Sequence, residues 1–530
     1  MKNRIQMILN RQYNIFVLYT IAFAIVSFCL IIPFLLRGNG IIAVADSYNQ
    51  VFPTFVYIKD YIYHLLHGNP IQFDFRIGLG DDPIYTLSHT GVLDITSILC
   101  ILLIPIENME YIFYLSILLK FYLSGVGFII YIRRYVKESG CILCGALLYT
   151  FQVCTLFEGL DFPPFLMMRV TLPFILHGVD ELEDHSTLSW SMILGLLCQG
   201  AMGVYGLYIV TLTVCIYYML ILWFQIRNHK INKSGMVKRT LITLFNGILG
   251  IGLSGIVLIP SIMSISYGIR KVETGNQFRL LYDMKTIFNM LSELFIPNVY
   301  ICTTTLSVLG LFVLLLGLKQ RTIPEHIKYI TYVMGLSALS PIMGSLMNGL
   351  SYSNLRWFFV VGFFANAVVT IMLDRRIAVE SKDKRIYYAI VIVILMVHLI
   401  INDKNNGMLI RIGVFAIMAL IVPYIWNKNN KLIYIYTFIL VIVTGSFVFG
   451  PKVLGGSGYS ANFQPLGTYQ KIMIRSNESL MGNKEEFERL DIYDLSINAS
   501  LIGNYYGTSE YFSIINMFQN FIKIFAFHRE

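Results

Sequence analysis

The sequence predicts an all-α protein that crosses a membrane many times, as a bundle of about thirteen transmembrane helices with small exterior segments. Two features of its composition predict this class. Hydrophobic residues make up 56% of the 530 residues and charged residues only 13%, with a mean hydropathy of +0.66. Soluble domains carry roughly 25% charged residues, so this chain has too few to cover a soluble surface. A third observation is a series of apolar runs near the length of about 20 residues that spans the hydrocarbon core.

The apolar runs divide the chain in order, and each is expected to form a helix. The first covers residues 14–36 and is predicted to stay in the protein, because it is long and lacks a small-residue cleavage site. The other predicted spans lie near residues 111–132, 140–157, 164–180, 188–203, 205–225, 239–262, 303–319, 327–345, 356–374, 386–401, 408–426 and 431–449. Residues 1–450 therefore form one predicted transmembrane domain. Residues 451–530 form an exterior C-terminal segment, at most a partial domain, with β-like pieces around residues 469–474.

Basic residues lie in alternate loops between the apolar runs, and the positive-inside rule then orients the chain. The clusters are Arg133, Arg134 and Lys137; Arg227, Lys230, Lys233, Lys238 and Arg239; Lys319, Arg321 and Lys328; and Arg375, Arg376, Lys382, Lys384 and Arg385. This pattern predicts a protein of the cytoplasmic membrane with its N-terminus inside and its C-terminal tail outside. It also explains the net charge of +9 without a nucleic-acid partner.

Two loops are then exterior, residues 37–110 and residues 263–300. Within the first, Gly91–Ile106 is apolar enough for a short span, but counting it as one would reverse the orientation of every later loop. We therefore expect it to lie on the outer face or to dip into it. Tyr48–Leu65 is expected to be a second interfacial helix, because its aromatic side chains suit the headgroup zone.

The cysteines and the acidic pairs predict no metal site. Cys141-x-x-Cys144 is a lone pair without the second pair that a zinc site needs, so we expect neither zinc nor redox chemistry there. Asp81 and Asp82 could bind a cation, but they follow Gly78-Leu79-Gly80, where a turn is the commoner meaning. No metal or other cofactor is predicted.

Three cations lie in or at the ends of apolar runs, all in the predicted outer half. Lys120, Arg169 and Arg356 each stand in such a position, where a charge costs at least ~2.5 kcal/mol and marks a functional site by default. Each could pair with a carbonyl or a nearby acid and hold helices together. Alternatively, with Asp46 and Asp161 at the same face, they could hold an anionic ligand such as a lipid phosphate.

Asp46 follows the first span closely and has two interpretations. If a lipid phosphate carries a sugar, the phosphate is already a good leaving group and needs no general acid. One carboxylate then suffices to take the proton from an incoming hydroxyl on the opposite face. The alternative is that Asp46 caps the helix that begins near Tyr48, a common use of aspartate.

Several short motifs occur along nearly the whole chain. They are Asp46-x-x-x-Gln50; Gly78-Leu79-Gly80, followed by Tyr85-x-x-Ser88 and an apolar helix ending in Pro105; Leu119-Lys120-x-x-x-Ser124-Gly125; Leu172-Pro173-Phe174 after Arg169; Arg356-Trp357; and Asn498-Ala499-Ser500-Leu501. In these motifs and their order the chain resembles the YfhO family of bacterial membrane proteins, of the GT-C class of polyprenyl-phosphate-sugar glycosyltransferases. The chain departs from many relatives in having Ser88-His89 instead of Ser-Pro. It also ends soon after Asn498, so we expect a short or truncated member.

The resemblance implies an inverting transferase with a GT-C-like bundle that works outside the cytoplasmic membrane. Its donor would be a sugar on undecaprenyl phosphate, its acceptor a cell-surface polymer such as a teichoic acid, and Asp46 its general base. We expect Lys120, Arg169 and Arg356 to contact the phosphate, with Gln50 and Arg76 as weaker candidates for positioning the sugar or the loop. The rival hypothesis is a transporter or flippase of lipid-linked saccharides, which would line the membrane midplane with polar groups.

Overall fold

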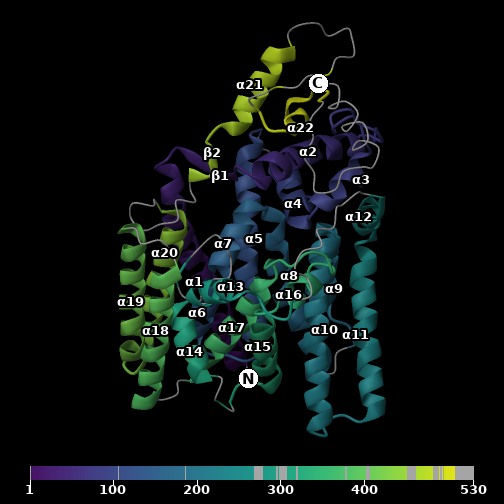
Figure 1. Ribbon diagram of the computed structural model, residues 1–530. Helices are drawn as coiled ribbons and strands as arrows, with labels where there is room; N and C mark the ends of the chain where they lie inside the picture. The colour runs from purple at the N-terminus through teal and green to yellow at the C-terminus, as the bar shows by residue number, and fades with distance from the viewer. Residues whose placement is uncertain are drawn as a thin grey trace.

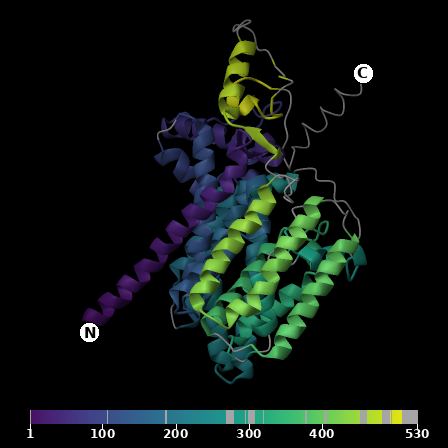
Figure 2. The same ribbon diagram turned by 90° about the vertical axis from the view of Figure 1, so that its left-hand side faces the viewer.

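The computed structural model describes residues 2–104, 107–184, 187–267, 279–293, 296–297, 307–317, 320, 322–375, 379–401, 406–450, 461–480, 489, 492 and 495–507. It is a bundle of helices with a smaller layer, formed by the first loop and the tail, over one end (Figure 1). We call this the loop end. The first helix begins at the opposite end of the bundle (Figure 2). Within the predicted loop 263–300, residues 268–278, 294–295 and 298–300 lie outside the described residues, as does most of the tail.

Every predicted span falls on one or more helices, so the all-α membrane class is confirmed. The helices of the bundle are α1 (Lys2–Leu35), α5 (Met109–Ile132), α6 (Ser139–Thr150), α7 (Val153–Asp161), α8 (Leu166–Glu183), α9 (Trp190–Met202), α10 (Val204–Arg227), α11 (Lys233–Leu253), α12 (Gly255–Tyr267), α13 (Met284–Glu293), α14 (Val308–Gly317), α15 (Glu325–Ser337), α16 (Pro341–Leu346), α17 (Phe358–Arg375), α18 (Ser381–Ile401), α19 (Asn406–Trp426) and α20 (Asn430–Phe449).

The count of thirteen spans is not confirmed. Within the described residues, seven helices are long and apolar enough to cross a membrane, or nine if each of two bent pairs is one span. Two of the other predicted spans fall short for physical reasons. Helix α9 has only 13 residues, and α8 carries charges within the helix, at Asp180, Glu181 and Glu183.

The first loop is largely helical. It contains β1 (Asn39–Ala43), the π-helix η1 (Ser47–Val51), α2 (Phe52–Leu66), α3 (Pro83–Leu87), the 3-10 helix η2 (Ser88–Thr90) and α4 (Ile95–Leu103). The expected helix over Tyr48–Leu65 is therefore present as η1 and α2. The predicted helix in Gly91–Ile106 is α4. The chain bends by 112° between η2 and α4, as in a broken span or a re-entrant loop.

Gly91 makes that bend possible. Its φ is +76°, in the left-handed region where a side chain is strained. A Cβ at this position would also lie 2.7 Å from Cβ of Pro164 and 3.2 Å from the carbonyl oxygen of Met202. The glycine thus lets the bend pack directly against the segment before α8 and against the C-terminal end of α9.

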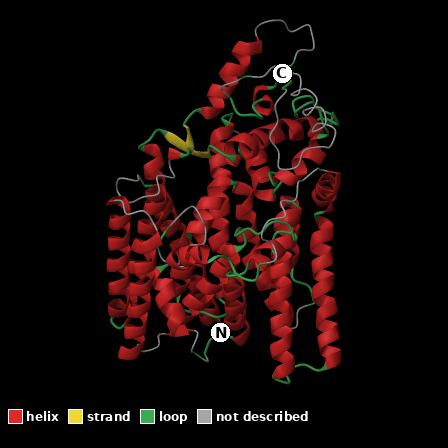
Figure 3. Ribbon diagram, viewed as in Figure 1, coloured by secondary structure: helices red, strands yellow, loops and turns green. Residues whose placement is uncertain are grey.

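The described part of the tail packs on the first loop. Strand β2 (Phe463–Pro465) pairs antiparallel with β1 in the two-stranded sheet coloured yellow in Figure 3. Helix α21 (Thr468–Leu480) follows, and α22 (Ser500–Gly503) lies against both α21 and α2. The buried carboxylate of Glu110, on α5, accepts hydrogen bonds from the backbone N–H groups of Gly467 and Tyr469 at 3.2 and 3.1 Å. A bundle helix thereby caps the start of α21.

The predicted β-like pieces around residues 469–474 are wrong, since the segment belongs to α21. Ile472 and Ser476, four residues apart, are both fully buried. That spacing places them on one face of a helix. Consecutive apolar residues at Ile472 and Met473 fit the 3.6-residue period and do not fit strand alternation.

The bent helix α4 is fixed to the bundle by a buried ion pair. Nζ of Lys120, on α5, lies 2.8 Å from Oδ2 of Asp94 and donates to Oγ of Ser97 at 2.9 Å. The exposed fractions of the Lys120 and Asp94 side chains are 2% and 0%. Asp94 also caps α4, accepting from the backbone N–H of Ser97 at 3.0 Å and from the hydroxyl of Thr96. One carboxylate therefore both begins α4 and neutralises Lys120.

This pair gives the first testable prediction. Asp94→Asn should lower the free energy of unfolding by about 3–5 kcal/mol, because it leaves Lys120 buried without a counter-charge. Lys120→Met in the same chain should recover most of that loss, since it removes the stranded charge. Thermal unfolding in detergent measures both. A single Asp94→Asn variant as stable as the wild type would contradict the pairing.

Candidate active site

Two carboxylates and one arginine come together at the loop end of the bundle. Asp46 stands directly before η1, Asp161 ends α7, and Arg356 lies two residues before α17, next to Trp357. The Asp161 carboxyl lies within electrostatic range of both Asp46 and Arg356. Helix η1 contacts the 3-10 helix η3 (Pro163–Phe165), which follows Asp161 and joins α7 to α8. Three segments distant in sequence therefore form one polar group.

Asp46 does not act as the predicted helix cap. Its backbone is helical (φ −62°, ψ −33°), whereas an N-cap residue usually has extended dihedrals. Its side chain makes no capping hydrogen bond to η1. The side chain is half-buried, on the same side of the bundle as Asp161. The geometry therefore speaks against the cap interpretation, and the catalytic role of Asp46 stays a prediction.

Arg356 is held in place by aromatic groups. Its guanidinium lies 5.2 Å from the ring centroid of Phe165 and forms a hydrogen bond with Tyr205. Glu158 is a further electrostatic neighbour. Among the residues that the structure describes, Arg356 makes no ion pair, and its side chain is half-buried. A guanidinium fixed in this way keeps donors for an incoming anion such as a phosphate.

Arg169 is fully enclosed and already paired. Its guanidinium donates to the carboxylate of Glu158, to Oγ1 of Thr155 at 3.1 Å and to the carbonyl oxygen of Phe165 at 2.9 Å. It also lies over the ring of Phe359, with no exposed side-chain surface. Arg169 thus joins α7 to α8. Since Lys120 is paired in the same way with Asp94, the structure favours the alternative in which these two cations hold helices together.

Arg76 lies at the centre of an ionic network in the first loop. Its guanidinium donates to Asp74, with Nη2 to Oδ2 at 2.6 Å, to Asp60 at 2.7 Å and to Oδ1 of Asn504, in the tail, at 3.0 Å. The Tyr57 ring lies beneath it, 4.7 Å from the guanidinium carbon to the centroid. These contacts suit a role in positioning the loop. Gln50, the other weaker candidate, is buried within η1.

Burial and charge act in opposite directions on Asp74. Burial alone would raise the pKa of its carboxyl. Hydrogen bonds and positive charge from Arg76, with a hydrogen bond from the Tyr57 hydroxyl at 2.7 Å, instead hold that pKa below the ordinary value of 3.8. A carboxyl with a lowered pKa in the folded state adds stability above its unfolded pKa and loses it as the pH falls.

Three residues of this region were missed in the sequence. Asp94 partners Lys120, Glu158 partners Arg169, and Tyr205 holds Arg356. Only Asp94 left a local signal, an aspartate three residues before Ser97 at the start of an apolar run, which is the pattern of an N-cap. Glu158 and Tyr205 become relevant only through packing.

The predicted turn is present at residues 78–79, shortly before Asp81 and Asp82. Asp82 caps α3 by accepting from the backbone N–H of Tyr85 at 2.9 Å, and Asp81 accepts from Oγ1 of Thr86 at 2.7 Å. Within the described ranges, no group of three or more His, Cys, Asp or Glu side chains lies close enough to hold a metal ion. The absence of a metal requirement stays a prediction.

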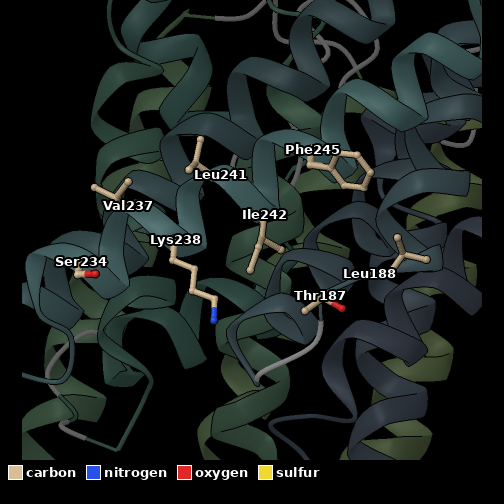
Figure 4. Close-up of a pocket in the computed structure, with 8 residues that line it drawn as sticks. All are labelled: Thr187, Leu188, Ser234, Val237, Lys238, Leu241, Ile242 and Phe245. Carbon is tan, nitrogen blue, oxygen red and sulfur yellow. The ribbon is translucent and has the colours of Figure 1, made fainter.

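A cavity with mostly apolar lining lies elsewhere. About 800 Å³ in volume, it is formed by the first half of α11 and the segment before α9, with mostly apolar side chains and one cation, Lys238 (Figure 4). No carboxylate lines it. It therefore lacks a general base, and the polar group around Asp46 is the better candidate for catalysis.

Comparison with known families gives one match along almost the whole chain. The family described as "Bacterial membrane protein YfhO" matches residues 18–524. This confirms the resemblance carried by the motifs around Asp46, Lys120 and Asn498. No curated protein matches the chain.

Several solved structures are similar in shape. They are the archaeal oligosaccharyltransferase AglB from Archaeoglobus fulgidus, in complex with an inhibitory peptide and a dolichol-phosphate (TM-score 0.44, 10% identity, 93% of this chain); the arabinofuranosyltransferase AftD from Mycobacteria (0.49, 11%, 94%); and ArnT from Cupriavidus metallidurans in the apo state (0.48, 10%, 96%). The chain spans 64%, 32% and 88% of their respective lengths.

The Asp74 network gives a second testable prediction. Contact between loop and tail should be unchanged between pH 7 and pH 5, and should weaken as the pH falls below about 3.8, because Asp74 must then take up a proton and release Arg76. Amide hydrogen exchange at residues 74–82 and 496–503, corrected for intrinsic rates, measures this. Asp74→Asn should remove most of the pH dependence. An equal pH dependence of hydrogen exchange in the wild type and in Asp74→Asn would refute the role assigned to Asp74.

Proposed function

The chain belongs to the YfhO family of bacterial membrane proteins, and we propose that it is a GT-C-type glycosyltransferase. It moves a sugar from a polyprenyl-phosphate donor to a glycan of the cell envelope. The observation that carries the proposal is the meeting of Asp46, Asp161 and Arg356 at the loop end of the bundle. A half-buried arginine without an ion pair among the described residues, and a carboxylate that caps no helix, both lie within electrostatic range of Asp161 and would supply an anion contact and a base for one site.

In the proposed mechanism Arg356 holds the phosphate of the donor. Its guanidinium presents paired N–H groups in a plane, which suits a phosphate oxygen pair. The acceptor hydroxyl attacks the anomeric carbon from the face opposite the phosphate. A new carbon–oxygen bond forms, the bond to the phosphate oxygen breaks, and its electron pair leaves with the lipid phosphate. The sugar therefore changes anomeric configuration.

Asp46 takes the proton of the acceptor hydroxyl in this mechanism. A single carboxylate is enough, because the leaving phosphate needs no protonation. Asp161 lies within electrostatic range of Asp46 and Arg356, and we assign it to orienting the acceptor or the base. Arg169 and Lys120 act indirectly in this proposal, by holding α7 and α4.

We further propose that the reaction takes place at the outer face of the cytoplasmic membrane. The start of α1 and the loop end lie at opposite ends of the bundle, which suits an N-terminus inside and the site outside (Figure 2). Undecaprenyl phosphate as the lipid carrier and a teichoic acid as the acceptor are the specific partners proposed. The mechanism as written uses no metal or other cofactor.

The third testable prediction concerns the base. Asp46→Asn keeps the size of the side chain but cannot accept the proton, so kcat should fall by about 10²–10⁴-fold. Donor binding and the amount of folded protein should be unchanged. Transfer of labelled sugar from a polyprenyl phosphate in proteoliposomes measures kcat. The matched control is Asp184→Asn. Asp184 lies at the C-terminal end of α8, and its side chain is largely exposed. Full activity of Asp46→Asn would overturn the proposed function.

The fourth testable prediction concerns the phosphate contact. Arg356→Gln should weaken donor binding about 10- to 100-fold, because hydrogen bonds between charged groups contribute roughly 1.5–3 kcal/mol. Arg356→Lys should lose less, since it keeps the charge and loses only the planar pair of donors. Binding of a polyprenyl-phosphate sugar in nanodiscs gives the comparison. Arg475→Gln, on an exposed part of α21, is the control. Unchanged affinity in Arg356→Gln would assign this arginine to the fold alone.

A further inference from the structure

The tail makes two hydrogen bonds to the backbone that carries Asp46. Nδ2 of Asn498 donates to the carbonyl oxygen of Asn49 at 2.7 Å, and Oγ of Ser496 donates to that of Tyr48 at 3.1 Å. Both acceptors belong to η1 and lie within three residues of Asp46. Asn498 and Ser496 are 2% and 5% exposed. Water is therefore largely excluded as a substitute donor.

The sequence of the loop explains why these carbonyls need outside donors. Pro53 follows η1 at the start of α2, and proline has no backbone N–H. In the π-helical register the donor to Tyr48 would be the N–H of residue 53, and in the α-helical register the donor to Asn49 would be the same group. At Pro53 the π-helical register therefore loses the donor to Tyr48, and the α-helical register loses the donor to Asn49. A buried carbonyl without a donor costs about 1–3 kcal/mol, and the tail side chains supply what Pro53 lacks.

A second anchor holds the tail to the same loop. Oγ of Ser500 donates to the carbonyl oxygen of Arg76 at 2.8 Å. The Arg489 guanidinium donates to the carbonyl oxygens of Gly78 and Leu79 at 3.2 and 2.8 Å. Leu501 is buried with Tyr57, Ile77 and Leu87 in a small apolar cluster of its own. This anchor is independent of η1, so the tail stays attached when a single contact to η1 is removed.

We propose that Ser496 and Asn498 are positioning residues for the reaction: their donors fix η1 and thereby place Asp46 against the acceptor hydroxyl. The inference rests on the proposed function of Asp46. Asp46 directly precedes η1, so a shift of the η1 backbone moves the Asp46 carboxylate with it. A base displaced by about 1 Å from a productive geometry can lose 10²-fold in rate. The C-terminal tail is thus part of the catalytic machinery, although none of its described residues lies in the group of Asp46, Asp161 and Arg356.

The fifth testable prediction is a split between kcat and KM. Asn498→Ala should lower kcat about 10- to 100-fold, with KM for the polyprenyl-phosphate sugar within about twofold of wild type, because Arg356 is untouched. Ser496→Ala should act in the same direction, and Ser496→Thr, which keeps the hydroxyl, should recover most of the activity. Ser479→Ala is the matched control, since that exposed hydroxyl bonds only within α21, to the carbonyl of Arg475.

Pro53→Ala supplies a sharper test. Alanine at residue 53 has a backbone N–H, which can donate to the carbonyl oxygen of Tyr48 or Asn49. The double variant Pro53→Ala, Asn498→Ala should therefore have a much higher kcat than Asn498→Ala alone. All rates are divided by the amount of folded protein, measured by thermal unfolding in detergent. The combined variant also keeps the test decisive if Asn498→Ala folds poorly, because restored folding without restored kcat refutes a positioning role.

The outcomes separate this inference from the proposed function. Loss of activity in Asp46→Asn, together with wild-type kcat in Asn498→Ala and Ser496→Ala, would overturn the positioning role alone. Full activity in Asp46→Asn would overturn the proposed function, and the inference with it. A fall in kcat that is fully explained by a smaller amount of folded protein would also refute the inference. The two hydrogen bonds would then contribute to the stability of the fold and not to the position of Asp46.

Discussion

The neutralisation of charge inside the bundle is the constraint on which the candidate site depends. Lys120 and Arg169 have almost no exposed surface, and an unpaired charge there would cost several kcal/mol. Their partners, Asp94 and Glu158, are not interchangeable surface acids. Asp94 begins α4, and Glu158 lies on α7, one turn before Asp161. Each ion pair therefore sets the position of a short helix at the loop end. Because Asp161 ends α7, the pair between Arg169 and Glu158 also determines where the second carboxylate of the site lies.

This constraint separates the three cations by role. A cation that neutralises a buried acid gains little by taking a second anion, since its charge is already used and its donors are occupied. Arg169 shows this most clearly, with Glu158, Thr155 and the carbonyl of Phe165 on its guanidinium. Arg356 lies at the edge of the same group and rests on Phe165 and Tyr205, which orient it without neutralising it. We therefore propose the anion contact at Arg356, the most exposed of the three.

The sequence predicted the helices well because each depends on a local property, a run of apolar residues. The count of thirteen spans is not confirmed, because charges interrupt the predicted span at α8 and the helix at the predicted span 188–203 has only 13 residues. The partners within the site could not be predicted. Arg356 meets Asp161 only after α7, η3 and the start of α17 have packed, and nothing near Arg356 in the sequence signals that contact. The segment 469–474 was misread as β-like because a six-residue pattern is short evidence for either a strand or a helix. In the structure the burial of both Ile472 and Ser476, four residues apart, identifies a helical face.

The contacts between the tail and the first loop explain several short motifs that are uninformative in the sequence. A division at residue 450 is natural in the sequence, where the last apolar run ends, but the contacts do not follow it. Pro53 removes a donor near the start of the chain, and Asn498 supplies one near its end. Gly78-Leu79-Gly80 offers carbonyls that Arg489 takes. Each of these short motifs is uninformative alone, because proline, glycine and asparagine are common in loops. Together they form a complementary set of donors and acceptors, so first loop and tail constitute one structural unit over the site.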